Sequence, residues 1–136
     1  MFSVNEIQAL IPEKNGLLMV DEVLECTETT ITAQHKIQKE APYFKGHFPD
    51  APVVPGVLLV AGLQQTATLF LKQQKTIGAV ALGALKRVKF RQKVLPGQLI
   101  QYQVTLVAQT ATTYTFQGKV LLDGQTACQA KLCLTV

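Results

Sequence analysis

The residues with the most informative chemistry lie in one short segment, GHFPDAPVVPGVL, between Gly46 and Leu58. Its histidine, His47, has an imidazole with an ordinary pKa of about 6.5, so it can act as a base at neutral pH. The prolines limit the loop to few conformations. Pro55 and Gly56 open an apolar helix, whose first free N–H groups can bind the oxygen of a polarised carbonyl. The segment therefore predicts proton transfer next to a carbonyl group.

These residues also have a structural interpretation. On composition alone, a lone histidine in front of a buried helix is more often structural than catalytic. His35, on the apolar face of the alternating segment 29–38, has no acid or metal ligand near it in the sequence, and we interpret it as a core or edge residue. Cys26, Cys128 and Cys133 lack CxxC or Cys/His clustering, so we expect reduced packing residues and no metal site.

The elements that must position this segment follow from periodicity and turn signals. Ser3 and Glu6 form a capping-box pattern for a short helix over 4–10. A proline-rich loop over 39–55 leads into a helix that runs to about Lys72 and is apolar on every side of its first turns, so it must be buried. The predicted strands cover 17–26, 29–38, 77–85, 87–93, 99–108, 113–122 and 125–136, with turns at Thr27-Glu28, Pro96-Gly97 and Asp123-Gly124.

These elements predict one α+β domain over residues 1–136, in which about six mostly antiparallel strands curl around one helix. A composition of 48% apolar and 16% charged residues excludes disordered and low-complexity classes. One sheet layer cannot cover a helix on all sides, so we expect the uncovered side to meet a second protomer. The sequence contains no membrane-spanning stretch or secretory signal, which predicts a cytoplasmic protein without a membrane partner.

The order of residues in the segment closely resembles the signature GHFPxxPVxPGVL of the hot-dog-fold β-hydroxyacyl-(acyl-carrier-protein) dehydratases, the FabZ/FabA group of bacterial type II fatty-acid synthesis. The resemblance continues at Ile11-Pro12, at LLMVD over 17–21, at PYFK over 42–45, and at KRVKFR and LPG within 86–97. It implies a hot-dog fold, in which a curved antiparallel sheet wraps a long central helix. It also implies a dimer with two active sites at its interface.

The resemblance implies a role for each residue at a motif position. His47 would withdraw the α-proton of the substrate or position it for transfer, and the N–H of Gly56 would polarise the thioester carbonyl. Gln65 would support the residues that touch the substrate. Phe44 and Phe48 would line the acyl tunnel or, alternatively, belong to the core. The full set assigned to substrate binding is Phe44, Phe48, Val57, Gln64 and Gln65.

The chain departs from the family pattern where the general acid belongs. The family places Glu, or Asp in the FabA branch, five residues after the glycine, and this chain has Ala61 there. Gln64 and Gln65 are nearby, but an amide cannot donate a proton as an acid and could only hold a water. A missing general acid typically lowers the rate by about 10²–10⁴. Residues 13–15 also replace the family's His-Arg-Tyr, which puts its aromatic gate in doubt.

Four basic residues alternate with apolar ones after residue 86. By period two they would share one strand face, with Arg87, Lys89, Arg91 and Lys93 opposite Val88, Phe90 and Val94. The stripe is either a solvated face or, as the resemblance implies, a docking surface for the acidic acyl carrier protein. The net charge of +4 agrees with an acidic partner. Nucleic acid is not expected, because exposed aromatic residues between the basic ones are not predicted.

The leading interpretation is a (3R)-hydroxyacyl-(acyl-carrier-protein) dehydratase, a hydro-lyase that converts β-hydroxyacyl thioesters to trans-2-enoyl thioesters. It would need no metal or redox cofactor, and its substrate would arrive on the phosphopantetheine arm of the carrier protein. Two alternatives stay open. One is an acid-deficient hot-dog subunit that binds acyl chains or completes a site in a mixed dimer with a Glu-bearing paralogue. The other is an acyl-thioester hydrolase. A homodimer is expected, with a trimer of dimers as the larger assembly that the resemblance allows.

Overall fold

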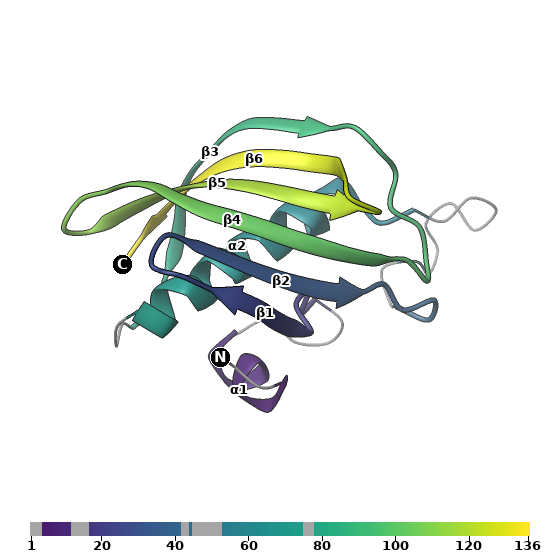
Figure 1. The fold of residues 1–136 in the computed structure, drawn as a ribbon, viewed down its shortest axis with the longest axis horizontal. Coiled ribbons are helices and arrows are strands. Elements are labelled where there is room, and N and C mark those ends of the chain that lie inside the picture. Colours follow the sequence, from purple (N-terminus) through teal and green to yellow (C-terminus); the bar gives the residue numbers. More distant parts are fainter. Residues whose placement is uncertain (1–3, 12–16, 42–43, 45–52, 75–77) are drawn as a thin grey trace.

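The computed structural model describes residues 4–11, 17–41, 44, 53–74 and 78–136. Two helices and six strands lie in these ranges (Figure 1). In chain order they are α1 (Val4–Leu10), β1 (Glu22–Cys26), β2 (Thr30–Lys36), α2 (Gly56–Gln74), β3 (Ala81–Phe90), β4 (Leu99–Gln109), β5 (Thr113–Leu122) and β6 (Gln125–Thr135). The predicted α+β class is therefore confirmed.

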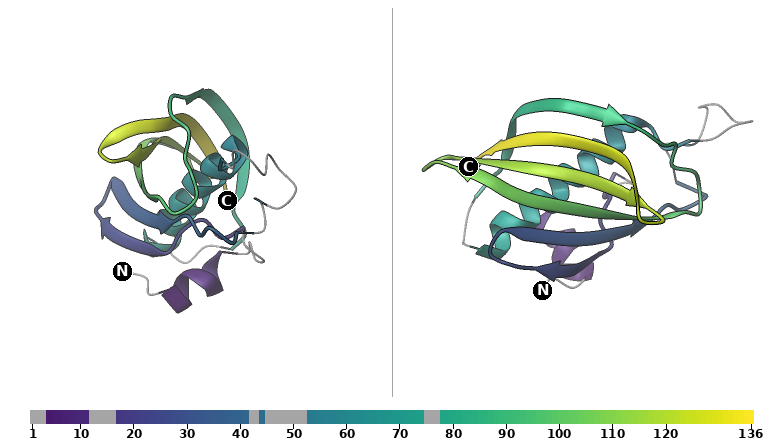
Figure 2. Two further views of the ribbon diagram at one scale, coloured as in Figure 1. Left: turned by 90° about the vertical axis from the view of Figure 1, so that its right-hand side faces the viewer. Right: turned by 45° about the horizontal axis from the view of Figure 1, so that its top comes forward.

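The six strands form one antiparallel sheet in the order β1-β2-β4-β5-β6-β3. The sheet is strongly curved and wraps around α2, as the end-on view in Figure 2 shows. Strand β3 follows α2 in sequence and pairs with β6, so it forms the sheet edge opposite β1. This arrangement, a central helix held inside a curled sheet, is the hot-dog fold.

The core lies between α2 and the concave face of the sheet. Alternate residues of β5 point inward, and Phe116 and Val120 are fully buried there. Phe70 of α2 meets Phe116 edge to face, with ring centroids 5.7 Å apart and ring planes at 82°. Full burial of one such side chain stabilises the fold by about 1.5–3 kcal/mol, so packing on α2 fixes where the helix lies in the sheet.

Two hydrogen bonds from the C-terminal end of α2 fix its direction in the sheet. The Lys72 Nζ donates a hydrogen bond to the Leu10 carbonyl at 2.9 Å, where it satisfies a free carbonyl at the end of α1. The Gln74 side chain donates to the Thr27 carbonyl at 3.1 Å, in the turn between β1 and β2. The C-terminus of α2 therefore lies at the β1–β2 turn, and its N-terminus lies at the other end of the sheet.

The turns agree closely with the sequence prediction. Strands β5 and β6 are joined by Asp123 and Gly124, which have φ values of 52° and 80°. Two consecutive positive φ values characterise the type I′ turn, which matches the twist of a hairpin and favours Asp-Gly. The ranges of α1 and β5 are also as predicted.

Three predicted element boundaries are wrong. The strand expected over 17–26 begins only at Glu22, because the Gln65 side chain of α2 binds the backbone of the segment before it. The two strands expected over 77–93 are one strand, β3, which ends at Phe90. The helix continues to Gln74 and is not buried on every side, since Val57 in its first turn is 72% exposed. No helix in the described ranges is both long and apolar enough to cross a membrane.

Candidate active site

The N-terminus of α2 is fixed against the segment that follows β3. The Val54 N–H donates to the Val94 carbonyl at 2.8 Å, just before the helix begins. The Leu58 N–H donates to the Pro55 carbonyl at 2.9 Å and closes the first turn. The first turn of this 19-residue helix contains no acidic side chain to occupy its N–H groups. This end of α2 can therefore bind the oxygen of a polarised carbonyl.

An aromatic ring covers the first residue of the helix. A Cβ built on Gly56 would lie 2.8 Å from both Cε1 and Cζ of Phe90. Phe90 is the last residue of β3, and its side chain is 55% exposed. The ring atoms Cε1 and Cζ lie against Gly56, and the residue is partly exposed beside the helix start.

One face of α2 is left partly open by the described chain. Ala61, Gln64, Thr68 and Lys72 follow one another at helical spacing on this face. The last three of them line an open groove of about 430 Å³ between α1 and residues 78–80. Ala61 is half-buried, and α2 contains no Asp or Glu at any position. The helix itself therefore carries no carboxylate at or near Ala61.

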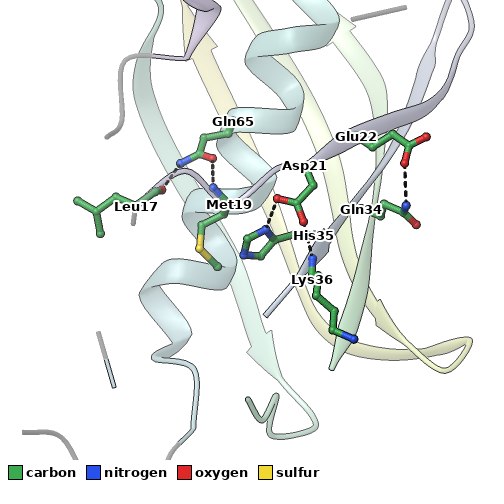
Figure 3. A network of polar contacts seen from close by, with 8 residues as sticks. All are labelled: Leu17, Met19, Asp21, Glu22, Gln34, His35, Lys36 and Gln65. Carbon is green, nitrogen blue, oxygen red and sulfur yellow. Dashed lines mark hydrogen bonds and ion pairs between the residues drawn. The ribbon is translucent and has the colours of Figure 1, made fainter. Parts of the chain in front are cut away.

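The two glutamines after Ala61 have different surroundings. Gln65 is 2% exposed, its Oε1 accepts the Met19 N–H at 2.7 Å, and its Nε2 donates to the Leu17 carbonyl at 2.9 Å (Figure 3). Its amide therefore anchors the segment before β1 to the helix. Within the described part of the chain the Gln64 side chain makes no hydrogen bond. Of the two amides, that of Gln64 is the one available to a ligand or water.

A second polar cluster joins the same segment to β2. Asp21 Oδ1 lies 3.0 Å from His35 Nδ1, and Asp21 Oδ2 accepts the Lys36 N–H at 2.7 Å (Figure 3). Burial alone would raise the pKa of Asp21. The hydrogen bonds from the His35 side chain and the Lys36 N–H, together with the charge of His35, outweigh burial and hold the pKa of Asp21 below 3.8. The expectation that His35 has no acid nearby is therefore wrong. The alternation of β2 placed His35 on the inner face but could not show the residue opposite it.

The other predicted site residues are placed as follows. His47 and Phe48 lie outside the described residues. Phe44 is half-buried and packs against the core, and its N–H donates to the Ala41 carbonyl at 3.1 Å. Val57 projects from the first turn of α2 and is largely exposed.

The basic residues do not share one strand face as predicted. The strand ends at Phe90, a bulge lies between Lys86 and Lys89, and Arg87 has a φ of 54°. A bulge and a left-handed residue break the period of two, and nothing in the alternation of the sequence reveals them. All four predicted residues are nonetheless exposed: Arg87, Lys89, Arg91 and Lys93.

Lys119 and Lys131, which are distant from β3 in the sequence, extend this basic surface. Lys131 is directly opposite Lys86 in the β3–β6 ladder, and Gln129 is opposite both Lys89 and Lys119. Directly opposite residues share a sheet face, and the neighbours of Lys131 on β6 are buried toward α2. These lysines therefore lie on the convex face. The signal available in the sequence was that residues 78–136 contain seven basic residues and one acid, Asp123.

The described residues provide no group of three or more His, Cys, Asp or Glu side chains suited to a metal ion. The three cysteines are free. Burial raises the pKa of Cys128 to about 11 and raises that of Cys26 as well, against a smaller lowering of the Cys26 pKa by the charge of the N-terminus. Thiols in this state are weak nucleophiles at neutral pH, which agrees with a packing role.

Comparison with solved structures assigns the fold to a known class. The structure is similar to the dehydratase heterocomplex ApeI:P from Xenorhabdus doucetiae, with a TM-score of 0.80, 12% identity, and coverage of 95% of this chain and 89% of that chain. It is also similar to the HP0420 homologue from Helicobacter felis, with a TM-score of 0.73, 12% identity, and coverage of 98% and 88%. The fold and the open helix N-terminus thus define an α+β protein of the hot-dog class.

The sequence comparisons specify the family within that class. Residues 11–131 match the model of the FabA-like domain. The chain is 35% identical to the 3-hydroxyacyl-(acyl-carrier-protein) dehydratase FabZ of Streptococcus pneumoniae strain CGSP14, over 100% of this chain and 99% of the relative. It is 31% identical to the FabZ of Clostridium perfringens strain SM101 over the same shares. The chain belongs to the FabA-like family.

Proposed function

We propose that the protein is a 3-hydroxyacyl-(acyl-carrier-protein) dehydratase of fatty-acid or related acyl-chain biosynthesis. It is a hydro-lyase that removes water from a (3R)-hydroxyacyl thioester and leaves a trans-2-enoyl thioester. The observation that carries the proposal is the end-to-end match to FabZ dehydratases at 31–35% identity. The open N-terminus of α2, next to the GHFP segment in sequence, supports it.

The proposed reaction needs a base, a carbonyl donor and an acid. His47 takes the proton from C2, and the N–H of Gly56 binds the thioester oxygen as negative charge develops there. The C3–O bond then breaks, the C2=C3 double bond forms, and the departing hydroxide takes a proton. These steps are proton transfers and one C–O cleavage, so no redox cofactor or metal is required by the chemistry.

The protein lacks the usual donor for the proton that the departing hydroxide takes. With Ala61 in place of a carboxylate, a water held by the free amide of Gln64 is the donor that the described helix offers. The hydroxide left by that water is then neutralised by the proton that His47 took from C2. Water is a much weaker acid than a carboxyl group of raised pKa. We therefore propose a slow homodimer, by about 10²–10⁴ relative to an enzyme with its acid in place.

A second candidate function follows from the same helix. Because α2 has no acidic residue at all, the protein would be an acid-deficient subunit that supplies His47 and Gly56 to a mixed dimer. A FabA-like partner with Glu at the position of Ala61 would then complete the site. Co-purification with such a partner, together with a rise in dehydratase activity on mixing, distinguishes this from the slow homodimer. Thioester hydrolysis without dehydration would support the third interpretation instead.

We also propose that the substrate arrives on acyl carrier protein, which docks on the basic residues near the start of α2. Arg91 and Lys93 lie just before Val94, and the Val94 carbonyl accepts the hydrogen bond from the Val54 N–H at the helix entrance. A carrier bound there would deliver its phosphopantetheine arm close to Gly56. Three free cysteines fit a reducing compartment, and we propose that this compartment is the cytoplasm.

The proposed assembly is a homodimer, with a trimer of dimers as its larger form. Strand β3 is a free sheet edge in the single chain, and Leu82 and Leu85 on it are 37% and 40% exposed. An exposed apolar edge strand favours pairing with another chain.

Hydration of a trans-2-enoyl thioester, the reverse reaction, tests the proposed function. The wild-type protein is expected to consume the enoyl thioester, and His47→Gln is expected to abolish this activity without changing the circular dichroism spectrum. His35→Gln is the matched control, because His35 is engaged with Asp21 and we assign it no catalytic role. Equal turnover by His47→Gln and wild type would overturn the assignment of the base.

A further inference from the structure

The contact between Phe90 and Gly56 explains why the helix begins with glycine. Among the described residues, the glycines with positive φ are Gly97 and Gly124, so the backbone at Gly56 does not require glycine. An N–H donor would be provided by any residue except proline. A side chain at Gly56 would have to displace the Phe90 ring, which lies 2.8 Å from where its Cβ would be.

The backbone that carries this aromatic ring is paired with β6. Phe90 is paired with Cys128 in the β3–β6 ladder, and the next residue, Arg91, donates its N–H to the Ala127 carbonyl at 2.8 Å. Ala127 and Cys128 are fully buried. The backbone that carries the ring is therefore part of the sheet, although more than half of the ring's surface is exposed. The ring therefore stands beside the start of α2 with more than half of the residue accessible to a ligand.

We propose that Phe90 is a positioning residue for the proposed dehydratase reaction. Its ring keeps water away from one side of the Gly56 N–H and offers a flat apolar surface to the thioester group. A hydrogen bond from an N–H to a developing oxyanion is stronger where water is excluded. The inference rests on the proposed function, because it assumes that the Gly56 N–H binds the thioester carbonyl.

The carbonyl stretching frequency of a bound thioester measures this hydrogen bond directly. A saturated acyl thioester serves as the probe, since it has the carbonyl but cannot be hydrated. Wild type is expected to shift the band to lower frequency on binding. Phe90→Ala is expected to lose most of the shift, and Phe90→Tyr, which keeps the ring, is expected to retain it. Val107→Ala, at a similarly exposed position on β4, is the control and should retain it too.

A double-mutant cycle tests the contact itself. Gly56→Ala keeps the N–H, but its methyl group must push the Phe90 ring aside. We expect Gly56→Ala to lose the band shift as Phe90→Ala does, and the double variant to be no worse than either single variant, because both act through one contact. In turnover assays we expect kcat to fall by about tenfold while KM changes little, which is the pattern of a weakened transition-state interaction.

The possible failures are distinguishable. Absence of a band shift in wild type would overturn the role of Gly56 and with it the proposed mechanism. A wild-type shift that Phe90→Ala retains in full, with unchanged kcat, would overturn the role of Phe90 alone. Should Phe90→Ala fail to fold, Phe90→Leu keeps much of the apolar volume without the flat ring. Full retention of the shift and of kcat by Phe90→Leu would equally overturn the inference.

Discussion

We predict that Ala61 limits catalysis by the proposed homodimer. The change Ala61→Glu places a carboxyl group on the open face of α2, one turn before Gln64, and is expected to raise the hydration rate within the range of about 10²–10⁴ that a general acid supplies. Steady-state hydration of a trans-2-enoyl thioester is the measurement. Ala61→Gln is the matched control, since it has nearly the same shape but no proton to donate, and it should stay slow.

The turnover rate of the wild-type protein can contradict the prediction for Ala61. A homodimer that already turns over at the rate of a typical enzyme, about 10 per second, would show that another group donates the proton. Ala61→Glu would then bring no gain. Because Ala61 is half-buried, a carboxyl group there without a hydrogen-bond partner would also lower the stability of the fold.

Asp21 is expected to make stability depend on acid pH. Its folded pKa lies below its unfolded value of about 3.8, so its stabilisation is complete above that value and is lost as the pH falls through the folded pKa. Asp21→Asn should lower the free energy of unfolding by about 1 kcal/mol at pH 7, a modest value because the side chain is half exposed. Urea unfolding at pH 7 and near pH 3 is the measurement. A difference between variant and wild type that persists at the lower pH would contradict this assignment.

At the scale of single residues, the sequence predicted which face of an element a side chain occupies better than it predicted the side chain's hydrogen-bond partners. It placed Gln65 behind the site and His35 on an inner strand face. It could not show that Gln65 binds the backbone of Leu17 and Met19, 48 and 46 residues away, or that Asp21 lies beside His35. Such partners depend on which segment crosses which element, and periodicity within one element contains no information about that.

At the scale of elements, the helix and hairpins were predictable and β3 was not. Repeated apolar residues and Asp-Gly turns produce local signals, so α1, β5 and the β5–β6 turn are as predicted. The alternation over 86–93 indicated one regular strand face. The bulge between Lys86 and Lys89 and the left-handed backbone of Arg87 change which sheet face the later side chains occupy. The same irregularity brings the Phe90 ring onto Gly56 and leaves the basic residues on more than one face.

The basic surface next to β3 gives the prediction at this scale. Reversing the charge of Arg87 and Arg91 to Glu should weaken binding of acyl carrier protein, with an affinity that falls steeply from low to high salt, because exposed charges are screened. Turnover of a small thioester without the carrier should be unaffected. Lys36→Glu, an exposed charge reversal on β2, is the control. Loss of both activities together would assign the surface a structural role instead.

At the scale of the whole molecule, the sheet leaves part of α2 and the β3 edge without cover. Sedimentation equilibrium at micromolar concentration should therefore show no significant species at the monomer mass of 14.9 kDa. The reason is that one curled layer buries the middle and end of the helix, while Val57, Leu82 and Leu85 remain exposed. A clean monomer would remove the interface on which the proposed site depends.

The order of the strands also separates charge across the molecule. Strand β1 and its neighbouring residues contain Asp21, Glu22, Glu25 and Glu28, whereas β3, at the opposite edge of the sheet, adjoins most of the basic residues. The two edges thus act as the poles of an electric dipole that spans the width of the sheet. An acidic body approaching in solution experiences a torque that turns the β3 pole toward it before any contact forms. The fold therefore contributes to the orientation of an encounter as well as to its attraction.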